Sequence, residues 1–150
     1  MSHTYASVMI HGVFSTKRRQ TLLRREIIPE LARVVGGILR DRGGKLLAFN
    51  GTGDHVHLLA VLHPSHALAD QFRDVKAISS RWIHERFPDL SGFAWQSGYG
   101  AFSVSKSAAE EVSAYVARKE EHHRTGTFEE EFTALLERHG IEYDPKYVFD

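Results

Sequence analysis

The sequence predicts an α+β sandwich of ferredoxin-like type, in which a split βαβ order (βαββαβ) forms an antiparallel sheet and extra helices follow at the C-terminal end. Two observations predict it. Segments with apolar residues at every second position alternate with segments at helical spacing. The resulting order is strand, helix, strand, strand, helix, strand. The connections are short, as expected for a single domain over residues 1–150.

The first half supplies a strand, a helix and a hairpin. Pro29 falls near the first turn of the helix, and Gly43-Gly44 ends it. A glycine-rich turn then joins the two arms of the hairpin. The expected ranges are a strand over 5–14, a basic connection over 15–19, a helix over 24–42, hairpin strands over 45–50 and 55–62, and a turn over 51–54.

The second half supplies a long helix, an extended segment and two further helices. Pro88 ends the long helix. Ser107 and Glu110 have the spacing of a capping box and predict the start of the third helix. The expected ranges are a helix over 67–87, an aromatic extended segment over 93–105, a helix from 107 to about 123, and an acidic helix over 128–139.

Composition excludes several classes of protein. The absence of cysteine excludes disulfides, thiolate zinc sites and cysteine nucleophiles. No apolar run is long enough to cross a bilayer, and the start lacks a signal-peptide pattern, so we expect a cytoplasmic protein without a membrane partner. There is no Gly-x-Ser-x-Gly elbow and no P-loop.

Charge is distributed unevenly, although the formal net charge is zero. Residues 1–45 carry nine Lys and Arg against three Asp and Glu, whereas residues 120–150 carry three against nine. A basic first third suits a polyanion such as nucleic acid. Solvated helix faces and an acidic tail explain the same pattern equally well.

The segment His55-Val56-His57 is the strongest local candidate for chemistry. Residues i and i+2 of a strand point to the same face, so both imidazoles project side by side. Neutral imidazole is the commonest metal ligand among side chains. Asp54 could orient one ring from behind. Taken alone, the pair either binds a divalent ion or only forms hydrogen bonds within the fold.

Tyr115 is the candidate nucleophile. It lies in the middle of the third predicted helix, and Arg118, Lys119 and His122 follow at positions that share its helical face. Neighbouring cations favour the phenolate and its approach to an anion. A helical tyrosine that only packs in the core is the alternative.

Together these segments resemble the single-tyrosine transposases of small bacterial insertion sequences, including their repeat-associated relatives. His55-Val56-His57 after Gly-x-Gly-Asp is similar to the histidine–hydrophobic–histidine (HUH) motif of single-strand DNA nucleases. The resemblance covers essentially the whole chain, in order. Its other segments are 14–17, 95–104, Tyr115 with 122–124, 128–132 and 139–144.

The resemblance implies a transposase that cleaves and rejoins single-stranded DNA. His55 and His57 would bind a divalent ion, Mg²⁺ or Mn²⁺, which polarises the scissile phosphate. The Tyr115 hydroxyl would attack phosphorus, leaving a 5′-phosphotyrosine link and a free 3′-OH. Because the ester conserves the energy of the broken bond, no nucleotide cofactor is needed.

The resemblance also implies partners. Members of the family are commonly homodimers that read DNA hairpins near the ends of the element, and the tyrosine of one subunit can serve the histidine pair of the other. Whether Tyr115 acts in cis or in trans stays open. The candidate phosphate contacts are Lys17, Arg18, Arg19, Arg24, Arg25, Lys76 and Arg81.

One position departs from the family pattern. The family commonly has Gln four residues after the tyrosine as a third metal ligand, and this chain has Lys119 there. An ammonium group has no lone pair and cannot coordinate a metal. Either His122 takes the role, or Lys119 contacts the phosphate and the metal is held more weakly, or this copy is impaired in catalysis.

Two other functions remain open. One is a non-catalytic or domesticated DNA-hairpin-binding relative whose metal site has decayed through Lys119. The other is a metal-dependent hydrolase or small-ligand domain in which Tyr115 is structural.

Overall fold

The computed structural model describes residues 3–118 and 126–149. Its four strands form one antiparallel sheet in the order β2-β3-β1-β4. Read from the other edge, this is the 4-1-3-2 order expected for a split βαβ sandwich, so the predicted fold is confirmed. The strands are β1 (Met9–Ser15), β2 (Lys45–Thr52), β3 (His55–Val61) and β4 (Gly100–Ser103).

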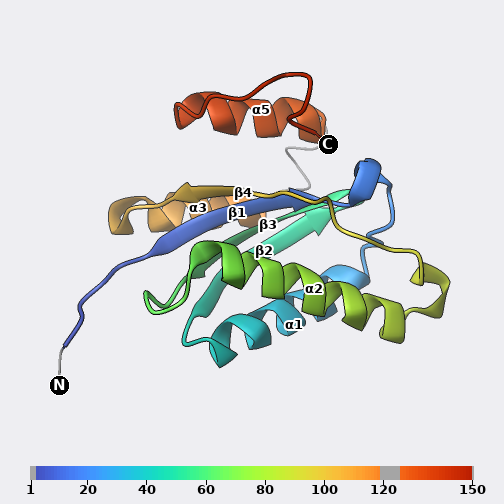
Figure 1. Cartoon of the computed structure of the whole chain (residues 1–150), viewed down its shortest axis with the longest axis horizontal. Coiled ribbons are helices and arrows are strands. Elements are labelled where there is room, and N and C mark those ends of the chain that lie inside the picture. The colour runs from blue at the N-terminus through green and yellow to red at the C-terminus, as the bar shows by residue number, and fades with distance from the viewer. Residues whose placement is uncertain (1–2, 119–125, 150) are drawn as a thin grey trace.

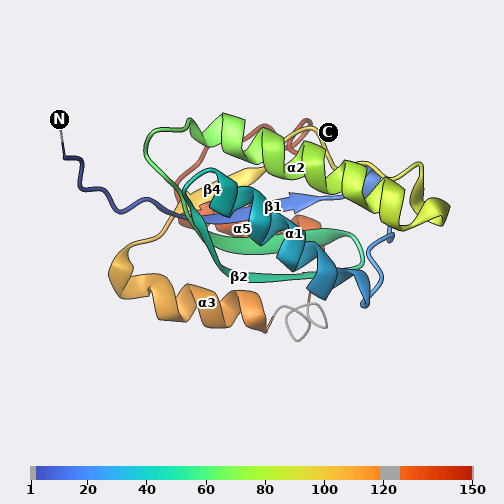
Figure 2. The ribbon, with the colours of Figure 1, turned by 90° about the horizontal axis from the view of Figure 1, so that it is seen from below.

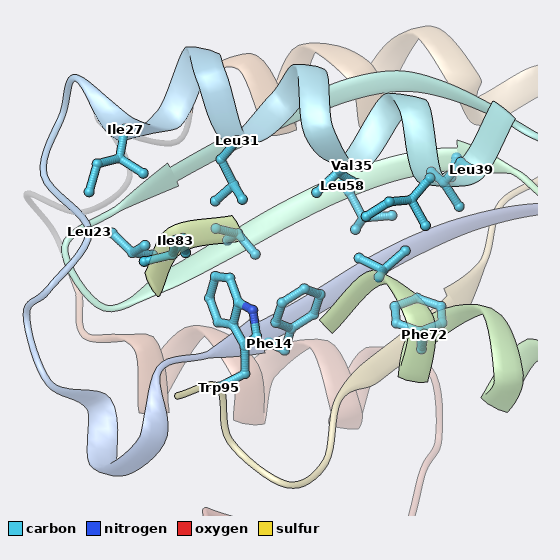
Figure 3. Packing of buried hydrophobic residues seen from close by; sticks show 14 of the residues in the cluster. Phe14, Leu23, Ile27, Leu31, Val35, Leu39, Leu58, Phe72, Ile83 and Trp95 are labelled. Atoms are coloured by element: carbon cyan, nitrogen blue, oxygen red, sulfur yellow. The ribbon is translucent and has the colours of Figure 1, made fainter. Parts of the chain in front are cut away.

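Two helices, α1 (Ile27–Asp41) and α2 (Leu68–Arg86), cover one face of the sheet (Figures 1 and 2). The main hydrophobic core lies between them and the sheet. Figure 3 shows Leu31 of α1, Leu58 of β3 and Phe14 of β1 meeting there. The alternation of β3 decides which side chains enter this core, because every second residue points to the helices.

The opposite face carries a smaller core under α5 (Phe128–Arg138), which lies on the far side of the sheet from α1 and α2 (Figure 1). Phe128 and Phe132 pack there against Val13 and Phe102. Helix α3 (Ala109–Ala117) runs alongside β2 (Figure 2) and packs against β2 and β3. The His55–His57 segment therefore lies on a face that is covered by the two C-terminal helices.

Gly100 allows α5 to approach the sheet closely. A Cβ atom at this position would lie 2.6 Å from Cε1 of Phe132, which is closer than carbon atoms approach one another. A glycine in a strand often marks such a close approach of another segment. The distance between α5 and the histidine face is therefore set in part by Gly100.

Several predicted boundaries differ from the structure. The first strand begins at Met9 rather than residue 5, because its pairing with β3 ends at the Met9–Val61 pair. The first helix begins at Ile27 rather than residue 24. Only Gly100–Ser103 of the aromatic segment 93–105 pairs as a strand, although Trp95 adds an isolated bridge to Thr16.

The capping box predicted at Ser107 and Glu110 is wrong. Helix α3 begins at Ala109 after a 3-10 turn, Lys106–Ala108, and its N-cap residue makes no side-chain hydrogen bond. The Ser107 hydroxyl instead lies 3.0 Å from the Ser105 hydroxyl. A cap of this kind occurs at α5, where Thr127 accepts a hydrogen bond from the Glu130 N–H.

No helix in the described part of the chain is long and apolar enough to cross a membrane.

Candidate metal centre and nucleophile

Strand β3 places His55 and His57 on the face covered by α3 and α5. Each is fully buried. In the register of the sheet, His57 lies opposite Val13 and His55 lies opposite Ser15 of β1. Opposed residues of an antiparallel pair share one face, so the two imidazoles project from the middle of the sheet into the layer beneath α5.

Glu131 of α5 completes a possible metal-ligand set with the two histidines. One ligand atom from each of the three residues lies within 4.8 Å of the others. Oε1 of Glu131 is 2.6 Å from Nε2 of His57. Two imidazoles and a carboxylate are ligands that divalent metals accept, and three protein ligands leave positions for substrate oxygen. The residues present therefore fit a divalent ion.

Each histidine has a hydrogen-bond partner behind it. Nδ1 of His55 donates to the Asp54 carboxylate at 2.6 Å. Nδ1 of His57 is 2.8 Å from Nε2 of His11, which is itself buried on β1. Partners at Nδ1 fix the ring orientation and direct Nε2 to the metal side. With an ion held at Nε2 of His57, its Nδ1 would carry the proton and donate the hydrogen bond to Nε2 of His11.

Tyr115 lies on α3 directly against this cluster. Its ring centroid is 5.8 Å from that of His57 and 5.9 Å from that of His11. Its hydroxyl donates to Oε1 of Glu131 at 2.8 Å, the same oxygen that contacts His57. Burial and the Glu131 carboxylate raise the pKa of the Tyr115 phenol above its ordinary value, because both disfavour the phenolate.

Neither Glu131 nor His11 was predicted from the sequence as a site residue. His11 and Val13 share one face of β1 because they are two residues apart, but only the β1–β3 register brings that face beside His57. Glu131 is one of three consecutive glutamates in an acidic helix, and nothing local distinguishes it from Glu129 or Glu130. Its position depends on how α5 docks.

Two predicted candidates lie outside the described residues. Lys119 and His122 both fall within 119–125. Asp54, the other predicted partner of the histidine pair, lies against Nδ1 of His55.

Three of the predicted DNA-contacting residues, Lys17, Arg18 and Arg19, form a 3-10 turn at the His55 end of the sheet. Arg18 and Arg19 both have positive φ, which is uncommon for residues with a Cβ. Arg19 forms an ion pair with Glu129 and donates to the Phe149 carbonyl at 3.0 Å. Contacts to α5 and the C-terminal segment thus hold this basic turn in place.

The remaining basic candidates are dispersed. Arg24 and Arg25 precede α1, and Arg24 pairs with Asp89 at 2.5 Å. Lys76 and the exposed Arg81 lie on α2, which covers the opposite face of the sheet. Burial lowers the pKa of Lys76, whose ammonium donates to the carbonyls of Ser97 and Gly98 at 3.1 and 2.8 Å. Lys76 thus holds a loop and is not directed toward the histidine face.

A scan against protein-family models matches residues 4–119 to the family described as "Transposase IS200 like". The matched residues include His55, His57 and Tyr115, the three side chains that the fold brings together. The chain belongs to the IS200-like transposase family. Glu131 and the rest of α5 lie beyond the matched residues.

Similar curated proteins agree with this assignment. The chain is 27% identical over 135 residues to the transposase for insertion sequence element IS200 of Salmonella typhimurium, covering 84% of this chain and 86% of that protein. It is 25% identical over 111 residues to the ISDra2 transposase TnpA of Deinococcus radiodurans, covering 71% of this chain and 79% of that protein.

Two solved structures share the fold. One is a crystal structure described as a transposase from Deinococcus radiodurans R1, with a TM-score of 0.64, 26% identity, and coverage of 79% of this chain and 95% of that chain. The other is a REP-associated tyrosine transposase bound to a REP hairpin, with a TM-score of 0.59, 16% identity, and coverage of 82% and 73% respectively.

Proposed function

We propose that this transposase cleaves and rejoins single-stranded DNA with Tyr115 as its nucleophile and a divalent ion, Mg²⁺ or Mn²⁺, at His55, His57 and Glu131. One observation carries the proposal. A single oxygen, Oε1 of Glu131, contacts both the Tyr115 hydroxyl and Nε2 of His57. Because the nucleophile and the metal-ligand cluster contact the same oxygen atom, they are close enough to act on the same phosphate.

The chemistry balances without a further reactant. The Tyr115 oxygen forms a bond to phosphorus, and the bond between phosphorus and the 3′ oxygen of the preceding nucleotide breaks. The phenol loses one proton and the leaving 3′ oxygen takes up one, so the step releases no net proton. The products are a 5′-phosphotyrosine and a free 3′-OH, and attack by another 3′-OH reverses the step with new ends. The bound ion supplies Lewis-acid polarisation of the scissile phosphate.

In this proposal Glu131 supplies the third ligand that the family pattern places four residues after the tyrosine. Lys119 at that position cannot coordinate. A carboxylate is a stronger ligand for Mg²⁺ and Mn²⁺ than an amide because it is charged. With Glu131 as the third ligand, Lys119 is compatible with an active site.

Incubation with a labelled single-stranded hairpin oligonucleotide and Mn²⁺, followed by a denaturing gel, tests the function. We expect a covalent protein–DNA adduct that disappears with EDTA. Hairpin binding without an adduct under any divalent ion would instead identify a non-catalytic DNA-binding relative. Hairpin DNA is the appropriate substrate, because a structural relative was solved with a REP hairpin.

We propose that His11 positions His57 for the metal. His11→Leu should weaken Mn²⁺ affinity by about 10–100-fold, as losses of such hydrogen-bond partners do. His11→Gln should restore most of it, because an amide oxygen can accept from Nδ1 of His57. Calorimetric titration of Mn²⁺ measures both, and ¹⁵N shifts of the His57 ring report its tautomer without metal. Equal affinities for the Leu and Gln variants would contradict this role.

The contacts support Tyr115 acting in cis, since it reaches the cluster of its own chain. Mixing Tyr115→Phe protein with His57→Ala protein tests this. We expect no recovery of adduct formation, because neither chain holds a complete site. Recovery in the mixture would establish a homodimer whose tyrosine acts in trans.

A further inference from the structure

We propose that a cavity beside Tyr115 binds one nucleotide of the DNA strand adjacent to the scissile phosphate, with Arg138 holding its phosphate and aromatic side chains contacting its base. The inference rests on the proposed function and adds to it a site on α5. Arg138 lies beyond residues 4–119, which the family model matches.

The cavity has a volume of about 310 Å³ and lies between β4, α3 and α5. His11 and Tyr115 both line it, so the cavity adjoins the histidine cluster on the side of the nucleophile. Ligand pockets in proteins begin at about 300 Å³. The space therefore suits a single small ligand, and its position makes that ligand a neighbour of the reacting phosphate.

Arg138 brings positive charge to this cavity. It follows Glu131 by seven residues, two turns along α5, with buried Leu135 between them. One stripe of α5 thus presents a carboxylate at the histidine cluster and a guanidinium about 10 Å away along the helix.

Arg138 makes no ion pair or side-chain hydrogen bond within residues 3–118 and 126–149. It stands in contrast to Arg19, Arg24 and Arg42, each of which pairs with a carboxylate. A guanidinium has the planar donor geometry that binds phosphate oxygens in pairs. No carboxylate in the described part of the chain pairs with it, which leaves its charge for a ligand phosphate.

Most of the remaining lining is aromatic, apolar or a small hydroxyl residue and suits a nucleobase, and Glu111 is its one carboxylate. Phe102 and His139 stack with ring centroids 4.6 Å apart and an interplanar angle of 28°, and both line the cavity with His11 and Tyr115. Aromatic side chains combined with positive charge are the usual means of holding single-stranded nucleic acid, because every base has a face that can stack. The lining thus provides contacts for both parts of a nucleotide.

A second cavity, of about 380 Å³, does not meet these requirements. It lies on α2 and contains Arg73 and Lys76. Arg73 pairs with Asp70 and Asp74, and Lys76 is bonded to two loop carbonyls. Both of its cations already bind partners within the protein, and α2 lies on the opposite face of the sheet from Tyr115.

The test is an NMR titration of the full-length protein with deoxyadenosine 5′-monophosphate and, separately, with inorganic phosphate. We expect the nucleotide to shift the ring signals of Phe102, Tyr115 and His139, and phosphate to shift them less. Arg138→Gln should weaken nucleotide affinity by about tenfold or more, the cost of a charged hydrogen bond. Arg40→Gln, which changes an exposed arginine of α1 on the other face, should leave it unchanged.

Absence of shifts at these rings, or an Arg138→Gln variant that binds the nucleotide as the wild type does, would overturn the inference. The metal-dependent adduct assay on the same preparations separates it from the proposed function. If the adduct forms normally but the nucleotide does not bind at this cavity, only the nucleotide-binding inference is refuted. If the wild-type protein forms no adduct, the proposed strand-transfer function is refuted.

Discussion

Tyr115→Phe is expected to abolish covalent attachment of the protein to single-stranded DNA, with a loss on the order of a thousandfold or more, since removal of a nucleophile has effects of this size. Phenylalanine keeps the ring that packs against His11 and His57 and removes only the oxygen. DNA binding should therefore persist. A gel-shift assay beside the denaturing adduct gel measures both properties.

Tyr143→Phe is the matched control. Tyr143 also donates its hydroxyl to a glutamate of α5, Glu137, at 3.2 Å, but it does not line the cluster. This variant removes an equivalent hydrogen bond and should form the adduct as the wild type does. Loss of the adduct in both variants would mean that the two hydroxyl groups are needed to hold α5 in place, and that Tyr115 is not the nucleophile.

Glu131→Ala is expected to weaken Mn²⁺ binding by about 100-fold or more, because even partners of a ligand are worth 10–100-fold in metal affinity. Adduct formation at limiting Mn²⁺ should fall accordingly and recover partly at high Mn²⁺, since His55 and His57 remain. Calorimetry on the DNA-free protein measures the affinity directly.

Glu130→Ala provides the comparison on the same helix. Glu130 is exposed, adjacent in sequence and equal in charge, so it controls for the loss of one acidic group from α5. Its Mn²⁺ affinity should equal that of the wild type. Unchanged affinity in Glu131→Ala as well would show that the third ligand comes from elsewhere in the chain.

Periodicity predicted the architecture because the fold is built from local patterns. Alternation in β3 and helical spacing in α1 and α2 are properties of short segments, and the short connections leave few topologies. Boundaries were less accurate. The end of pairing at Met9 depends on the length of β3, and the start of α3 depends on the 3-10 turn before it.

The residues of the candidate site also fall into two groups, those predictable from local sequence and those brought in by contacts between distant segments. His55 and His57 share a face because they are two residues apart on one strand, so their proximity could be predicted locally. Glu131 and His11 join them through contacts between segments far apart in the sequence. The docking of α5, which brings Glu131 to His57, depends on Phe132 and on the space left by Gly100, and neither identifies a ligand.

Identification of the modified residue tests the central claim most directly. The protein is reacted with a single-stranded hairpin oligonucleotide and Mn²⁺, digested with protease and nuclease, and analysed by tandem mass spectrometry. We predict a nucleotide attached through its 5′-phosphate to the Tyr115 oxygen, in the peptide that contains α3. Attachment at any other residue, or through a 3′-phosphate, would contradict the account.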